Sequence, residues 1–65
     1  MKTIYDPKTD TLSIELRPGP IAESDEVRPG IILDYDAEGK LVSLEILDAS
    51  RQVPNARSML FEVAT

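Results

Sequence analysis

Three acidic residues stand at alternate positions near the middle of the chain: Asp34, Asp36 and Glu38. Carboxylates with this spacing at a turn can supply several of the oxygen ligands that Ca²⁺ or Mg²⁺ takes, and a bound metal ion could then support hydrolysis. A structural interpretation is simpler, because Asp36 is suited to the first position of a turn over residues 36–39, where Glu38 would be solvated. We favour the turn and keep a metal-dependent enzyme as the alternative.

The remaining polar residues do not combine into a catalytic arrangement. Asp6 and Asp10 could form a carboxylate pair, but hydrogen bonds within a hairpin turn explain both without chemistry. The serines have no histidine to activate them, since the chain contains none. The three glycines are isolated and form no phosphate-binding loop. We therefore predict no catalytic residue, no metal site and no cofactor.

The size of the chain limits what it can bury. A domain of 65 residues buries only about 60% of the surface that its unfolded chain exposes. Disulfides and thiolate metal sites cannot supplement such a core, because the chain has no cysteine. We therefore expect stability to come from self-association, with a homodimer as the simplest form.

Charge and hydropathy exclude two classes of partner. The net charge is −5, and no two of the seven lysines and arginines are adjacent. Nucleic-acid binding depends on clustered basic residues, so direct contact with DNA or RNA is not expected. No apolar run reaches the length of a signal peptide or a membrane span. We expect a cytoplasmic protein that does not contact membranes.

Apolar residues alternate with polar ones along most of the chain, which is the pattern of half-buried β-strands. The pattern is clearest in residues 11–16, 31–35 and 41–47, and shorter strands are predicted at residues 2–5 and 24–28.

Turn sequences separate these strands. Asp6 and Pro7 occupy the first two positions of a type I turn, and Asp36 and Gly39 suit a hairpin whose glycine is left-handed. The predicted fold class is α+β: a small antiparallel β-meander of about four to five strands followed by a short C-terminal helix.

The periodicity changes after residue 47. Asp48 is the expected N-cap of a helical turn over residues 49–53, which Pro54 must end. Apolar residues then recur with helical spacing from Ala56 to Val63, which predicts a second helical segment, although residues 58–63 can also be interpreted as a sixth strand. We treat residues 1–65 as one domain, with the meander and helix start in 1–53 and a helix or tail in 54–65.

Both faces of the predicted sheet carry apolar side chains. In an extended chain, Ile32 points to the opposite face from Leu33, and Leu41 to the opposite face from Leu44. One short helix cannot cover both faces. Uncovered apolar surface on a small protein indicates a partner, and a two-fold dimer needs only one patch. The residues predicted for this oligomer interface are Ile32, Leu41, Met59, Leu60 and Phe61.

Glu23, Asp25 and Glu26 form an acidic run just before Pro29. Charges and a nearby proline protect an edge strand from unwanted pairing, which explains the run structurally. Alternatively, the run docks a small basic protein partner, whose association it would accelerate. The sequence leaves both interpretations open.

An ordered series of short motifs extends from residue 3 to residue 53. Its parts are Tyr5-Asp6-Pro7, the alternating segment of residues 10–16, Glu26-Val27-x-Pro29-Gly30-Ile31-Ile32-Leu33-Asp34-Tyr35-Asp36, and Gly39-x-Leu41-Val42-x-Leu44-Glu45-Ile46-Leu47-Asp48-Ala49-Ser50. This series resembles the short bacterial proteins catalogued as domain of unknown function 2283. The resemblance implies a small β-meander with a terminal helix and supplies no catalytic residue. It also suggests an antitoxin-like role beside a small basic protein similar to RNA-cleaving toxins.

Overall fold

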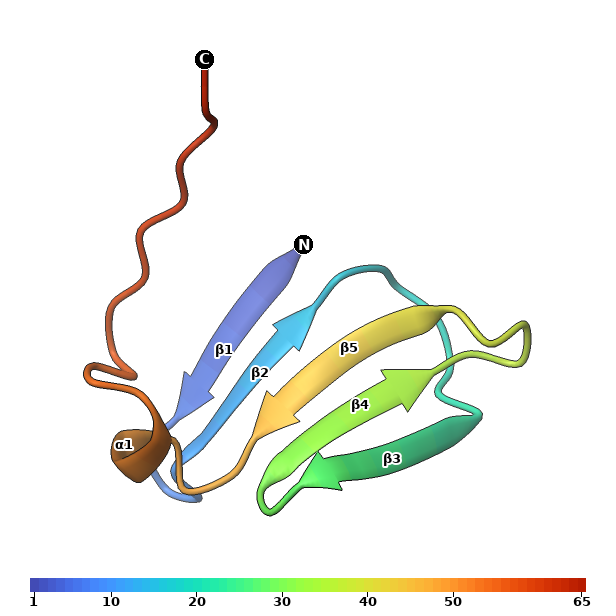
Figure 1. The fold of residues 1–65 in the computed structure, drawn as a ribbon, viewed down its shortest axis with the longest axis horizontal. Coiled ribbons are helices and arrows are strands. Elements are labelled where there is room, and N and C mark those ends of the chain that lie inside the picture. The colour runs from blue at the N-terminus through green and yellow to red at the C-terminus, as the bar shows by residue number, and fades with distance from the viewer.

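The computed structural model describes residues 1–65 as one five-stranded antiparallel sheet with a single short helix (Figure 1). The strands follow the predicted alternation closely, because side chains of an extended chain point to opposite faces in turn. The elements are β1 (Lys2–Asp6), β2 (Thr11–Glu15), β3 (Glu23–Arg28), β4 (Ile31–Tyr35), β5 (Leu41–Ile46) and α1 (Ala49–Gln52).

The strand order is β1-β2-β5-β4-β3, so the prediction of a simple meander is wrong at one point. β2 pairs with β5 and not with β3, which is an edge strand. The connection after β2 crosses the ends of two strands, where the N–H groups of Leu16 and Ala22 donate to the carbonyls of Val42 and Tyr35 at 2.8 Å each. This order puts the apolar strands β2, β5 and β4 in the centre and leaves polar β3 at the edge.

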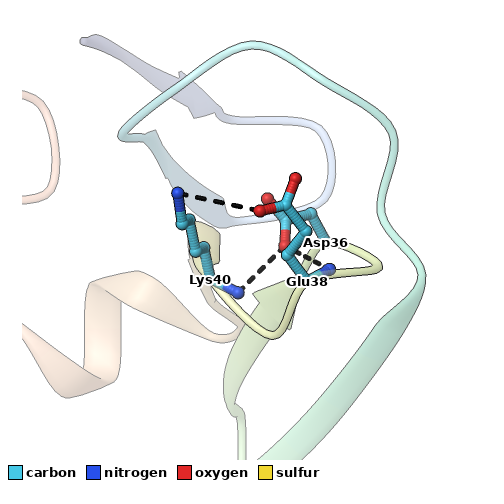
Figure 2. Close-up of polar contacts among 3 residues, drawn as sticks. All are labelled: Asp36, Glu38 and Lys40. Atoms are coloured by element: carbon cyan, nitrogen blue, oxygen red, sulfur yellow. Dashed lines mark hydrogen bonds and ion pairs between the residues drawn. The ribbon is translucent and has the colours of Figure 1, made fainter.

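Short-range hydrogen bonds form the two hairpin turns that join β1 to β2 and β4 to β5. Asp6 Oδ1 accepts the N–H of Lys8 at 2.9 Å, and Pro7 follows it in the turn. Asp36 Oδ1 accepts the N–H groups of Glu38 and Lys40 at 2.9 Å each (Figure 2). Gly39 has φ 81°, a left-handed conformation that glycine adopts without strain.

The C-terminal region departs from its prediction. The helical turn forms at Ala49–Gln52, before Pro54, but the predicted helix over Ala56 to Val63 does not, and residues 58–63 are not a strand either. Helix nucleation is unfavourable, so a short helix depends on packing its apolar stripe against the rest of the protein. The apolar side chains between Ala56 and Val63 contact too little of the sheet to hold a helix, and the tail runs past the sheet (Figure 1).

The sheet has no second layer to form a core against. Only Leu12, Val42 and Ala49 are buried among the apolar residues. The accessible surface is 5121 Å², whereas a compact monomer of this mass exposes about 4,100 Å². The radius of gyration is 12.5 Å, against about 10.7 Å for a compact chain of this length. The single chain therefore exposes about 1,000 Å² more surface than its size requires.

Candidate interaction surface

The register of the sheet collects apolar side chains on one face, which we call the apolar face. Residues directly opposite in an antiparallel pair share a face, so each row of partners can be followed across the strands. One row runs through Tyr5, Leu12, Ile46 and Ile31, and the next through Thr3, Ile14, Leu44, Leu33 and Asp25. The result is a continuous apolar surface across β2, β5 and β4.

Neither α1 nor another strand covers this face. The helix lies at the end of the sheet, where Gln52 Nε2 donates to the carbonyl of Leu47 at 2.7 Å and lies 3.5 Å from that of Gly30. Ala49, fully buried, is the only residue of α1 without exposed surface. The apolar face is therefore a surface that a partner could cover.

The C-terminal tail covers only the β1 end of the apolar face. Residues 56–59 border a shallow groove with Thr3, Tyr5 and Leu12, and the Arg57 guanidinium lies 5.5 Å from the centre of the Tyr5 ring. The Thr3 hydroxyl donates to Met59 Sδ at 3.7 Å. After Met59 no hydrogen bond or cation–π contact joins the tail to the sheet, and the apolar side chains there are exposed.

The residues predicted for the oligomer interface lie in separate places. Ile32 stands opposite Glu26 and Glu45, on the polar face, whereas Leu41 pairs with Tyr35. The tail residues of the prediction are exposed: Met59, Leu60 and Phe61. Met59 lies beside Thr3 of β1, and Leu60 and Phe61 follow it past the end of the sheet. The face predicted for Ile32 is observed, but its neighbours there are acidic and not apolar. The same prediction for Leu41 is wrong, because the register shift between Asp34 and Tyr35 brings Leu41 opposite Tyr35, on the apolar face.

The acidic run on β3 is divided between the two faces. Glu23 and Asp25 stand opposite Tyr35 and Leu33 and therefore border the apolar face. Glu26 stands opposite Ile32 on the polar face, where its carboxylate accepts the N–H of Gly30 at 2.9 Å. All six residues of β3 are exposed, so the run lines a free sheet edge.

The polar face contains a buried carboxylate. Asp34 is only 1% exposed, and its two oxygens accept the hydroxyls of Ser24 at 2.6 Å and Ser43 at 2.7 Å. The Glu45 carboxyl group lies on the same face and interacts with it. Burial alone would raise the pKa of Asp34, but the hydrogen bonds from Ser24, Ser43 and Glu45 outweigh burial and lower it. Asp34 is thus a buried anion that links β3, β4 and β5.

Glu45 has the opposite shift. Its hydrogen bond to Asp34, together with burial and the repulsion of the Asp34 charge, raises its pKa. The protonated Glu45 carboxyl group can donate to the Asp34 carboxylate, whereas the ionised group cannot. The interaction with Asp34 therefore favours the protonated form of Glu45.

We expect Glu45→Gln to raise the melting temperature at pH 7. A raised pKa in the folded state stabilises the fold below the unfolded pKa, and this contribution is lost as pH rises through the folded pKa. Glutamine keeps a donor toward Asp34 at every pH, so its advantage over the natural protein should shrink as pH falls toward about 4.5. Thermal unfolding across this range measures the difference.

Glu38→Gln, at an exposed turn position, is the control for the pH series, because its only ion pair is a 3.8 Å surface contact with Lys40. Equal melting temperatures of the natural protein and Glu45→Gln at every pH would show that the pair does not share a proton.

The three alternately spaced carboxylates do not meet. Asp34 is buried in the sheet, while Asp36 bonds to the turn backbone and Glu38 lies beside Lys40 (Figure 2). Glu45 stands at the twelfth position counted from Asp34, the spacing of a calcium loop. The segment folds as a β-hairpin and divides these carboxylates between a buried pair and a turn. No three acidic residues are placed to hold a metal ion.

Asp10 is a second polar centre that the sequence did not reveal. Its carboxylate accepts the Tyr5 hydroxyl at 2.7 Å, the Ser50 N–H at 3.0 Å and the Ser50 hydroxyl at 2.6 Å, while its carbonyl accepts the N–H of Ala49 at 2.9 Å. The hydrogen bonds from Ser50 and Tyr5 lower the pKa of Asp10. The β1–β2 turn therefore caps α1 from 40 residues away in the chain.

The predicted capping role of Asp48 needs correction. Asp48 occupies the N-cap position, but it is left-handed, with φ 50°, and its side chain makes no capping hydrogen bond. An N-cap side chain normally reaches the helix from an extended backbone. The left-handed backbone prevents this, and Asp10 supplies the acceptor instead.

Comparisons with known proteins agree with this small sheet. The family model described as "Protein of unknown function (DUF2283)" matches residues 2–50, which include all five strands and the start of α1. Neither the comparison with curated proteins nor the comparison with solved structures found a match. No helix in the structure is long and apolar enough to cross a membrane. Because the match covers most of its length, the chain belongs to the DUF2283 family of proteins of unknown function.

Proposed function

We propose that this protein is a non-enzymatic interaction module whose apolar face packs on the same face of a second copy. The observation that carries the proposal is the uncovered apolar face on a chain exposing about 1,000 Å² of excess surface. Two copies that each buried this excess would bury about 2,000 Å² together, the upper end of a standard stable interface.

The two edges of the apolar face differ in charge. Arg57 lies at the β1 edge, whereas Glu23, Asp25 and Arg28 border the β3 edge. A two-fold axis parallel to the strands would place the β1 edge of one copy against the β3 edge of the other, so that Arg57 of each copy meets an edge of net negative charge. This arrangement supports an isologous dimer.

The polar residues support the non-enzymatic part of the proposal. The carboxylates of Asp34, Asp10 and Asp36 already accept two or more hydrogen bonds each from the protein itself. Acceptors used in this way stabilise strands, turns and the helix start, and none is directed at a cleft.

Sedimentation equilibrium of the full chain at micromolar concentration tests the dimer. We expect a dimer whose melting temperature rises with protein concentration, because association stabilises only the folded chain. Leu44→Lys, in the centre of the apolar face, should weaken association at least tenfold, whereas Ser13→Lys on the polar face should not. A monomer whose unfolding is independent of concentration would overturn the proposal.

The exposed edge strand β3 favours a second candidate function, antitoxin-like binding of a small basic protein. Glu23 and Asp25 lie on a strand without a neighbour on one side, where a partner strand could pair while its basic side chains meet the carboxylates. Replacement of Glu23, Asp25 and Glu26 by serine should abolish capture of a small basic protein from the host and should reduce the salt dependence of its binding once purified. Unchanged capture would reject this candidate.

A further inference from the structure

The last residues of the chain carry apolar side chains that their own copy leaves largely exposed. Met59 is 56% exposed, Leu60 81%, Phe61 71% and Val63 75%. Scattered exposed apolar residues are normal, but four within five positions, interrupted only by Glu62, form an apolar segment. We call residues 59–63 the arm.

The backbone of the arm is also free. Residues 54–65 take part in none of the 31 backbone–backbone hydrogen bonds, the last of which is donated by Val53 to Ala49. An extended segment without such bonds is held only by side-chain contacts. The arm can therefore be repositioned without breaking secondary structure.

The arm extends past the end of its own sheet. Arg57 lies over Tyr5 and Met59 contacts Thr3, so the tail runs antiparallel to β1 toward its N-terminal end. Residues after Met59 therefore pass the first residue of β1, and the C-terminus lies well beyond the N-terminus (Figure 1). Its own copy offers no surface there for Leu60, Phe61 or Val63.

We infer that the arm of each copy packs on the apolar face of the second copy, so that the two copies exchange arms. This inference rests on the dimer proposed above and names the segment that completes its interface. The tail lies on the apolar-face side, because the three sheet residues lining its groove all belong to that face: Thr3, Tyr5 and Leu12. A second copy placed against this face brings its own apolar surface within reach of the arm.

The arm would extend the apolar contact at the β3 edge of the face, which the two-fold arrangement places nearest to the partner's tail. Leu33 and Tyr35 are the apolar residues there, and Asp25 and Glu23 stand opposite them at the rim. Phe61 and Val63 would pack on Leu33 and Tyr35 and leave the two carboxylates in solvent, because burying an unpaired charge is costly. Glu62 would point away from the face, as the alternation of an extended chain requires.

Isotope-filtered NMR on a mixture of ¹³C-labelled and unlabelled chains tests the exchange. Phe61 is the only phenylalanine, so its ring signals need no further assignment. We expect NOEs from the Phe61 ring of one copy to the Leu33 or Leu44 methyl groups of the other. A dimer whose Phe61 ring has no intermolecular NOE would overturn the inference.

Truncation provides an independent measurement. A chain ending at Ser58 should bind its copy at least tenfold more weakly than the full chain in sedimentation equilibrium, while a chain ending at Val63 should be unaffected. If the chain ending at Ser58 dimerises with unchanged affinity, arm exchange is wrong although the dimer stands. If the full chain itself is a monomer, both proposals fail.

Discussion

Replacement of Asp34 by alanine is expected to cost about 2–4 kcal/mol of unfolding free energy, because it leaves two hydroxyls without their acceptor and opens a small cavity. Ser43 is only 7% exposed, so water cannot readily replace the lost carboxylate. Urea unfolding monitored by circular dichroism measures the loss. A cost of this size would leave little of the stability of a 65-residue chain.

Two milder variants keep this prediction measurable if Asp34→Ala does not fold. Asp34→Asn retains one acceptor oxygen and gains a donor for Glu45, so it should cost clearly less than alanine. Ser24→Ala removes one hydrogen bond near the surface and should cost about 1 kcal/mol. Equal stability of Asp34→Ala and the natural protein would show that the buried carboxylate does not hold β3, β4 and β5 together.

Asp10→Gly should detach α1 from the sheet and lower the melting temperature markedly. The substitution removes the acceptor for the Tyr5 hydroxyl, the Ser50 N–H and the Ser50 hydroxyl at once. Glycine tolerates the left-handed backbone at this position, where φ is 54°, so the effect reports the lost carboxylate and not backbone strain. Hydrogen exchange of the Ser50 amide should become much faster.

Asp48→Gly is the matched control for Asp10→Gly. Asp48 is also left-handed, with φ 50°, but its side chain makes no capping bond. This variant should therefore match the natural protein or exceed its melting temperature. If Asp48→Gly lowered the melting temperature more than Asp10→Gly, Asp48 and not Asp10 would be the residue that caps α1.

Strands and turns were predictable because their causes are local. The strand predicted at residues 31–35 is observed as Ile31–Tyr35, since alternating side chains need only two-residue periodicity to define a face. The turn at Asp36 and Gly39 also formed, because its hydrogen bonds span no more than four residues. Likewise, Pro54 follows the end of α1, since proline cannot donate within a helix.

The C-terminal segment shows where local patterns stop being sufficient. Its apolar spacing suits a helix over Ala56 to Val63 and its alternation suits a strand, yet the single chain forms neither. Both structures require a surface to pack on, and the sheet offers none beyond Met59. The conformation of this segment is therefore decided by what surrounds it.

The sequence by itself determined the strands, the turns, the short helix and the presence of apolar residues on both sides of the sheet. Only the tertiary structure decided the order of the strands, the pairing of Asp34 with Glu45 and the capping of α1 by Asp10. These features join residues 11 to 40 positions apart, so they depend on which apolar faces pack together. Local periodicity carries no information on that choice, because β2 could pair equally well with any strand of the same alternation.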